Sequence, residues 1–146
     1  MKLHFEIAST FEAVDQVVQQ IVKTFKNDFP NHPPRTAFII DFALREIMNN
    51  AVEHGNRMDV NKRVLCDFYV EEQRIYLAIT DEGSGFELNK AIPEDVLQDL
   101  TRERNRGLQI ISLMGFTVSV LGSSVRAELN LETVEKREVI ASEKRS

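Results

Sequence analysis

The sequence has few of the residues that support cross-linking, zinc binding or membrane insertion. Its 146 residues include one cysteine, Cys66, and three histidines that lie far apart, so we expect neither a disulfide framework nor a zinc site. No apolar run approaches the roughly 18 residues of a membrane span, and the N-terminus lacks the apolar core of a signal peptide. We therefore expect a cytoplasmic protein in a reducing compartment.

Charge and motif content exclude two further classes of protein. The net charge is −5, so nonspecific binding to nucleic acid or to an anionic membrane is not expected. The G-x-x-x-x-G-K-[ST] loop of Walker-type nucleotide sites is absent. The length and the apolar content of 42% suit one globular domain. We expect this domain to cover residues 1–132, followed by a charged, disordered tail over 133–146.

The spacing of apolar residues predicts the element order β-α-α-ββ-α-ββ. Alternation of apolar and polar residues predicts the strands, and helical spacing predicts the helices. The expected strands are 3–7, 64–70, 74–80 and a second hairpin within 116–131 that turns at 122–124. The expected helices cover about 10–27, 35–54 and 108–115.

Hairpins dominate this order, and hairpins make antiparallel sheets. We therefore predict an α+β fold, a two-layer sandwich with a mostly antiparallel sheet and the helices on one face. Ser9 and Glu12 form a capping-box pattern at the start of the first helix. Gly55 is a suitable C-terminal stop for the second helix.

The segment LREIMNNAVEHGN, residues 44–56, is unusually polar for a helix that contributes to a core. Leu44, Ile47 and Met48 gather on one face, while Glu46 and Asn50 lie one turn apart on the opposite face. A buried polar group costs free energy unless it has a partner. Considered alone, the segment is best interpreted as a core helix whose second half is solvated.

Two glycine motifs follow later in the chain. The segment DEGSG, from Asp81 to Gly85, comes directly after a strand, and its glycines permit close approach or a turn with positive φ. The segment NRGL, from Asn105 to Leu108, begins a helix whose first N–H groups favour an anion such as phosphate. Taken separately, each motif is as well explained by an ordinary turn or helix start.

Taken together and in this order, the three motifs resemble the ATP-binding fold of the gyrase, heat-shock chaperone, histidine kinase and MutL families, the GHKL or Bergerat-fold ATPases. The E-x-x-x-N element is Glu46 to Asn50, the D-x-G-x-G element is Asp81 to Gly85, and the later glycine element contains Gly107. The resemblance covers residues 3–132. It is closest to the small bacterial anti-sigma factor serine kinases, which share the N-A-x-x-H-G extension and the D-E-G-x-G-F form. The chain is too short for gyrase-type transducer domains, and we do not expect the phosphoacceptor helix pair of a complete histidine kinase before the domain.

The resemblance implies a role for each motif. Glu46 would be the general base that accepts a proton from an attacking hydroxyl. Asn50 would be the protein ligand of Mg²⁺, and Asp81 would accept a hydrogen bond from the adenine amino group. The other positions implied to contact ATP are Gly83, Gly85, Arg106, Gly107, Leu108 and Ser124. The segment from Glu87 to Arg104 is implied to form a lid over the nucleotide.

The resemblance also implies a function and partners. The chain would use ATP and Mg²⁺ to phosphorylate a serine on a STAS-type anti-sigma factor antagonist, and it would sequester a sigma factor. The family suggests a homodimer, formed through the edge of the N-terminal strand. Asn105, Gln109 and Gly115 depart from residues common in the family. They leave open a nucleotide-sensing protein-binding module without phosphate transfer, and a structural protein that binds no nucleotide is a third alternative.

Overall fold

The computed structural model describes residues 1–83 and 106–135. Its five strands form one sheet in the order β1-β2-β3-β5-β4, and every neighbouring pair is antiparallel. The strands are β1 Lys2–Ala8, β2 Arg63–Glu71, β3 Arg74–Asp81, β4 Thr117–Leu121 and β5 Ser124–Asn130. The predicted antiparallel sheet is therefore confirmed.

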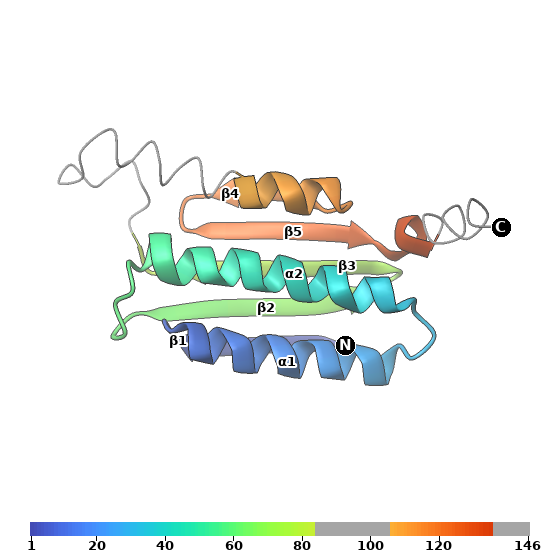
Figure 1. Cartoon of the computed structure of the whole chain (residues 1–146), viewed down its shortest axis with the longest axis horizontal. Helices are drawn as coiled ribbons and strands as arrows, with labels where there is room; N and C mark the ends of the chain where they lie inside the picture. Colours follow the sequence, from blue (N-terminus) through green and yellow to red (C-terminus); the bar gives the residue numbers. More distant parts are fainter. Residues whose placement is uncertain (84–105, 136–146) are drawn as a thin grey trace.

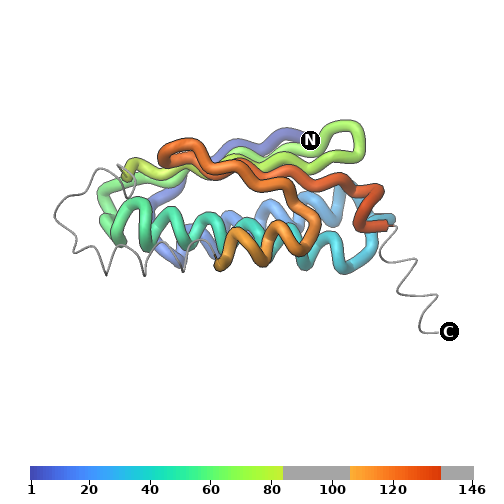
Figure 2. Tube along the Cα trace, turned by 90° about the horizontal axis from the view of Figure 1, so that it is seen from above, coloured from blue at the N-terminus to red at the C-terminus, as the bar shows by residue number. Residues whose placement is uncertain are grey.

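The helices cover one face of this sheet. They are α1 Phe11–Asp28 and α2 Pro34–Asn50, with α2 continuing into the π-helical turn η1 Ala51–Gly55, and shorter helices over 106–113 and 131–135. Figure 1 views the molecule from the helical side, and Figure 2 shows the helices and the sheet as two layers. The predicted two-layer α+β sandwich is confirmed. Among the described residues, no helix is both long and apolar enough to cross a bilayer.

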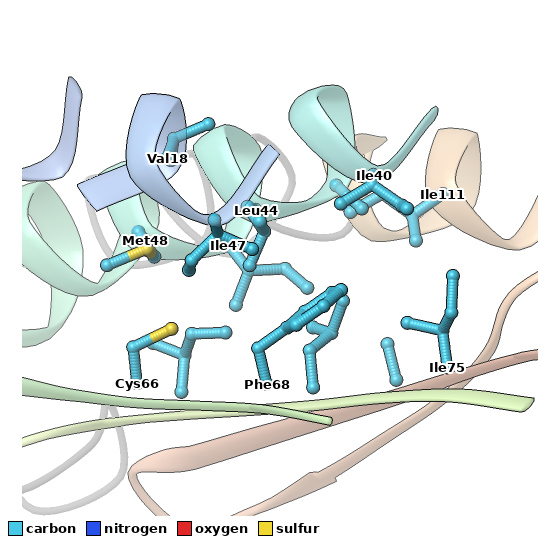
Figure 3. Packing of buried hydrophobic residues seen from close by; sticks show 14 of the residues in the cluster. Val18, Ile40, Leu44, Ile47, Met48, Cys66, Phe68, Ile75 and Ile111 are labelled. Carbon is cyan, nitrogen blue, oxygen red and sulfur yellow. The ribbon is translucent and has the colours of Figure 1, made fainter. Parts of the chain in front are cut away.

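The core lies between the two layers. Alternate residues of β2 and β3 point toward the helices, as the sequence pattern predicts, and Phe68 and Ile75 are fully buried. From the helical layer, Ile40, Leu44 and Ile47 meet these strands (Figure 3). Each such side chain stabilises the fold by about 1.5–3 kcal/mol when it leaves water. The apolar face of the LREIMNN helix is thus accounted for by the core.

Ion pairs join α1 and α2 on their outer side. Arg45 of α2 donates to Asp15 Oδ1 of α1 at 2.6 Å and to Asp41 Oδ1, one turn earlier on α2, at 2.7 Å. The hydrogen bond from Arg45 lowers the pKa of Asp15 below its usual value, and both carboxylates raise the pKa of Arg45. These groups are partly exposed, so the pairs orient α2 more than they stabilise the fold.

The start of α1 differs from the predicted capping box. Thr10, with extended φ and ψ of −136° and 151°, is the N-cap, and its hydroxyl accepts from the Ala13 N–H at 3.1 Å. Ser9 is fully buried and accepts instead from the side-chain amide of Asn56 at 3.1 Å. Either hydroxyl could cap a helix. Because Ser9 is hydrogen-bonded to Asn56, Thr10 caps α1.

The end of the domain also differs from the prediction. We expected Leu131 to continue the last strand and the disordered tail to begin at residue 133. The side chain of Asn130 instead accepts from the Glu132 N–H at 2.9 Å, and residues 131–135 form a helical turn. Leu131 and Val134 are 1% and 3% exposed, so this turn packs on the core. Residues 136–146 lie outside the described part of the chain.

The single cysteine should be chemically inert in the folded protein. Cys66 is fully buried on β2, and burial, with a contribution from the Asp67 charge, raises the pKa of its thiol to about 12. At pH 8 the thiol should therefore remain in its unreactive protonated form. We expect no labelling by iodoacetamide at pH 8 and complete labelling in denaturant, measured by intact mass. Fast labelling of the native protein would contradict this burial.

Candidate functional site

Four chain segments meet at one end of the sandwich, on the left in Figure 1. They are the end of α2 with the turn η1, the end of β3, the start of the 106–113 helix, and the turn between β4 and β5. Direct contacts join them: Gly107 packs on Glu46, Gly55 packs on Asp81, and the Asp81 N–H donates to the Ser123 carbonyl at 3.0 Å. The fold therefore gathers the described residues of the three sequence motifs in one place.

The first contact brings Glu46 against the glycine of the third motif. A Cβ atom added to Gly107 would lie 1.9 Å from Glu46 Oε1 and 2.6 Å from its Cδ. Gly107 is buried, and Glu46 is half-buried. A side chain at residue 107 would force the Glu46 carboxylate to move, so Gly107 allows this carboxylate its present position.

The second contact surrounds Asp81 with two glycines. Asp81 is 5% exposed, and its Oδ1 accepts from the Gly83 N–H at 2.8 Å. A Cβ on Gly55 would lie 2.1 Å from Asp81 Oδ2, and a Cβ on Gly83 would lie 2.1 Å from the Gly55 carbonyl oxygen. Neither glycine has positive φ. Both are needed for close packing around the carboxylate, which corrects the interpretation of Gly55 as a simple helix stop.

The turn that carries Gly55 is a π-helix. α2 ends at Asn50, and in η1 the Asn56 N–H donates to the Ala51 carbonyl at 2.8 Å, five residues back. A π-turn changes the phase of the residues that follow it and is frequent at functional sites. Here the π-turn follows the helical face that carries Glu46 and Asn50, and it ends at Gly55, the glycine that packs on Asp81. His54, 9% exposed, lies within the same turn.

The amides at the end of α2 hold polar atoms without partners. Asn49 Oδ1 and Asn50 Nδ2 are buried and, in the described part of the chain, have no hydrogen-bond partner. Each such atom costs about 1–3 kcal/mol, so a native structure that keeps two of them on successive residues calls for an explanation. A ligand that completes these hydrogen bonds would supply one. The site at Asn50 therefore has the character of a binding site.

These residues fit a nucleotide with a divalent cation. The Asn50 amide has a donor suited to a phosphate oxygen and an oxygen of the type that Mg²⁺ accepts, and Glu46 adds a carboxylate one turn away. Within residues 1–83 and 106–135, no three His, Cys, Asp or Glu side chains gather as a metal cage. Mg²⁺ commonly binds through one or two protein oxygens together with phosphates and water, so this small donor set suits it.

The other predicted positions have different surroundings. Arg106 is exposed at the first residue of its helix, and Leu108 is partly buried against the core. The Ser124 hydroxyl accepts from Thr80 Oγ1 at 3.1 Å, which places Ser124 beside the strand end that carries Asp81. Gly85, Asn105 and the predicted lid over 87–104 lie outside the described residues.

One residue of the site was missed in the sequence. Asn56 is fully buried and bonded through both ends of its amide, to Ser9, to the Arg63 carbonyl and to the Glu82 N–H. An asparagine that follows glycine suggests a turn, because such residues commonly bond their own neighbours. Its partners here lie on three other segments, and no local pattern indicates them.

A separate hollow lies on the face of the sheet opposite the helices. It has a volume of about 810 Å³ and is lined by residues of all five strands, among them Tyr69 and Tyr76, whose rings stack at 4.6 Å. Within it His4 pairs with Asp67 at 2.5 Å. None of the described side chains there has a buried atom without a partner, so its chemistry does not indicate a ligand.

Comparison with known proteins agrees with the geometry. A family model of the histidine kinase-like ATPase domain matches residues 7–133, which include Glu46, Asn50, Asp81 and Gly107. A search of curated protein sequences finds no significant match. The matched region covers most of the chain and the whole of the site described above. The chain therefore belongs to the histidine kinase-like ATPase domain family, within the GHKL-type ATPase superfamily.

Proposed function

We propose that this chain binds ATP with Mg²⁺ and transfers the terminal phosphate to a serine of a STAS-type anti-sigma factor antagonist. In its other state it would hold a sigma factor. The observation that carries the proposal is the placement of the Glu46 carboxylate against Gly107, one turn from Asn50, whose Nδ2 is buried without a partner in the described structure. Transfer of a phosphate to a hydroxyl requires a base, a metal ligand and room for the phosphate to approach closely.

The phosphate end of the site would be formed by α2 and the 106–113 helix. Asn50 would provide an amide ligand to Mg²⁺, and Mg²⁺ supplies charge neutralisation of the phosphates when bound. Arg106 and the N–H groups at the start of its helix would add positive potential. Glu46 would accept the serine proton as the serine oxygen bonds to the terminal phosphorus and the bond from that phosphorus to the bridging oxygen of ADP breaks.

The base end of the site would be formed by the Asp81 turn. A buried carboxylate is a hydrogen-bond acceptor, so Asp81 would select the amino group of adenine over the carbonyl of guanine. Gly55 and Gly83 have no side chains, so they leave space for the Asp81 carboxylate and the backbone packed around it. Ser124, at the start of the neighbouring strand β5, would support this end through Thr80.

The proposed homodimer concerns a different surface. Within the described residues no strand pairs with the outer edge of β1, so its N–H and C=O groups can accept another strand. Pairing of β1 with β1 of a second copy would extend the sheet. Sedimentation of the purified protein at several concentrations would measure the association.

The proposed kinase activity predicts phosphate transfer to a specific partner. Incubation with γ-labelled ATP, Mg²⁺ and a STAS-domain protein encoded beside the gene should place label on one serine of that protein, located by mass spectrometry. Omission of Mg²⁺ should abolish the label because the metal neutralises the transferred phosphate. ATP binding without transfer, combined with partner affinity that depends on the nucleotide, would identify the protein as a nucleotide-sensing module instead.

A further inference from the structure

We infer that Asn56 is a positioning residue that holds the Asp81 turn in place and thereby sets the preference of the site for adenine. The inference rests on the proposed nucleotide function. Asn56 is fully buried, so its side chain cannot serve as a surface contact for a ligand. It acts through its hydrogen bonds to the segment that carries Asp81.

Asn56 belongs to a closed ring of three residues. Its Oδ1 accepts from the Glu82 N–H at 2.8 Å, Glu82 Oε2 accepts from the Arg63 N–H at 2.5 Å, and the Arg63 carbonyl accepts from Asn56 Nδ2 at 2.9 Å. Each residue both donates and accepts within the ring. The ring therefore joins the end of η1, the start of β2 and the turn after β3.

The ring acts directly on the position of the carboxylate. Glu82 is the residue between Asp81 and Gly83, and the Gly83 N–H donates to Asp81 Oδ1 at 2.8 Å. The backbone of the turn is thus bonded at Glu82 by Asn56 and at Gly83 by Asp81 itself. Loss of the Asn56 bond would release the N–H of Glu82 and let the turn and the carboxylate shift together.

The backbone around Asn56 supports this role. Arg57 and Met58 both have left-handed φ, 54° and 61°, although neither is glycine. Such conformations cost about 1–3 kcal/mol and persist where surrounding contacts demand them. The Met58 N–H donates to the Val52 carbonyl at 2.8 Å, and the Asp59 N–H donates to the Asn56 carbonyl at 3.0 Å. These hydrogen bonds hold the backbone after Asn56 in a strained conformation, in which the Asn56 amide points into the protein.

A second anchor fixes Asn56 on its far side. Its Nδ2 also donates to Ser9 Oγ, which is fully buried at the junction of β1 and α1. This bond lies outside the ring. Removing the Ser9 hydroxyl would weaken the fold but would leave the ring bonds to Arg63 and Glu82 in place. Ser9→Ala therefore distinguishes a loss of overall stability from a loss of the positioning of the Asp81 turn.

The test compares affinities for ATP and GTP, measured by calorimetry with Mg²⁺ present. Asn56→Ala should weaken ATP binding by about tenfold, the size of effect expected when a polar recognition group is misplaced, and should weaken GTP binding much less. Its turnover at saturating ATP should stay within about threefold of wild type, because the phosphate end is unchanged. Glu82→Ala removes only the ring bond that Glu82 Oε2 accepts from the Arg63 N–H and keeps the bond from the Glu82 N–H to Asn56 Oδ1, so it should leave most of the preference for ATP in place.

Two control variants accompany these. Ser9→Ala should lower the melting temperature and keep the wild-type preference for ATP, and Asn61→Ala, an exposed amide in the following loop, should change neither. An unchanged preference in folded Asn56→Ala, beside a wild type that prefers ATP, would overturn this inference alone. Equal loss of ATP and GTP would assign Asn56 a merely structural role and would also overturn it. If Asn56→Ala does not fold, hydrogen exchange of the Glu82 amide in the wild type decides: exchange as fast as that of an exposed, unbonded amide would show that Asn56 does not hold the turn and would overturn the inference. A wild type that binds neither nucleotide would overturn the proposed function as well.

Discussion

Replacement of Glu46 by Gln is expected to lower phosphate transfer by a factor of about 10²–10⁴, the usual contribution of a general base, with ATP affinity nearly unchanged. Gln has the shape of Glu, so the side chain can still pack on Gly107, where a Cβ would meet Oε1 at 1.9 Å. It has no carboxylate to accept the serine proton. The measurement is the rate of label transfer at saturating ATP, together with the dissociation constant for ATP.

Glu53→Gln is the matched control for this variant. Glu53 lies in η1, two turns after Glu46, and its side chain is 52% exposed with His54 Nε2 at 3.9 Å. The same change of acid to amide there should leave transfer close to the wild-type rate. Transfer that survives in Glu46→Gln would remove Glu46 from the proposed chemistry. If the affinity for ATP in Glu46→Gln fell by the same factor as the transfer rate, Glu46 would be a binding residue instead.

The second large effect is expected from Gly55→Ala, which should weaken ATP binding by about 100-fold, or about 2.7 kcal/mol. The new Cβ would lie 2.1 Å from Asp81 Oδ2 and 2.3 Å from Asp81 Cγ. Because Asp81 is 5% exposed and already bonded to the Gly83 N–H, it has little room to move away from the new methyl group. The adenine acceptor would then be misplaced. Calorimetry with ATP and Mg²⁺ measures the loss.

Two further variants accompany Gly55→Ala. Gly122→Ala is the control, and Asp81→Asn should also weaken ATP binding, by a different change. Gly122 has φ of +61°, and an added Cβ would meet no atom within 4 Å. Its replacement should cost about 1–2 kcal/mol of stability through left-handed strain and leave ATP binding intact. Asp81→Asn removes the charged acceptor without a clash, so it tests base recognition if Gly55→Ala fails to fold. Tight ATP binding in both folded variants would refute the role of the Asp81 turn.

The strands were the most predictable part of the fold. Alternation in Val64, Cys66 and Phe68 placed β2 within one residue of its observed ends, because a half-buried strand must bury every second residue. The helix ends were less predictable. Ser9 and Thr10 are adjacent hydroxyl residues, and only the bond from Asn56 to Ser9 shows which one caps α1.

The π-turn could not be predicted from its sequence. The residues of η1, AVEHG, also suit an ordinary α-helix, and a helical reading up to residue 54 follows from the apolar spacing. The extra residue in the turn is compatible with the contact that Gly55 makes with Asp81 on β3. Contacts of that kind depend on how α2 lies across the sheet, which local propensity does not contain.

By itself, the sequence determined the α+β class, the element order, the antiparallel hairpins and the three motifs that the histidine kinase-like ATPase family model covers. These follow from local periodicity and from residue types in order. The tertiary structure alone decided that Glu46 touches Gly107, that Gly55 and Gly83 enclose Asp81, and that Asn56 joins three segments. Each of these contacts joins residues from different elements, so it exists only once the sheet register and the helix packing bring those elements together.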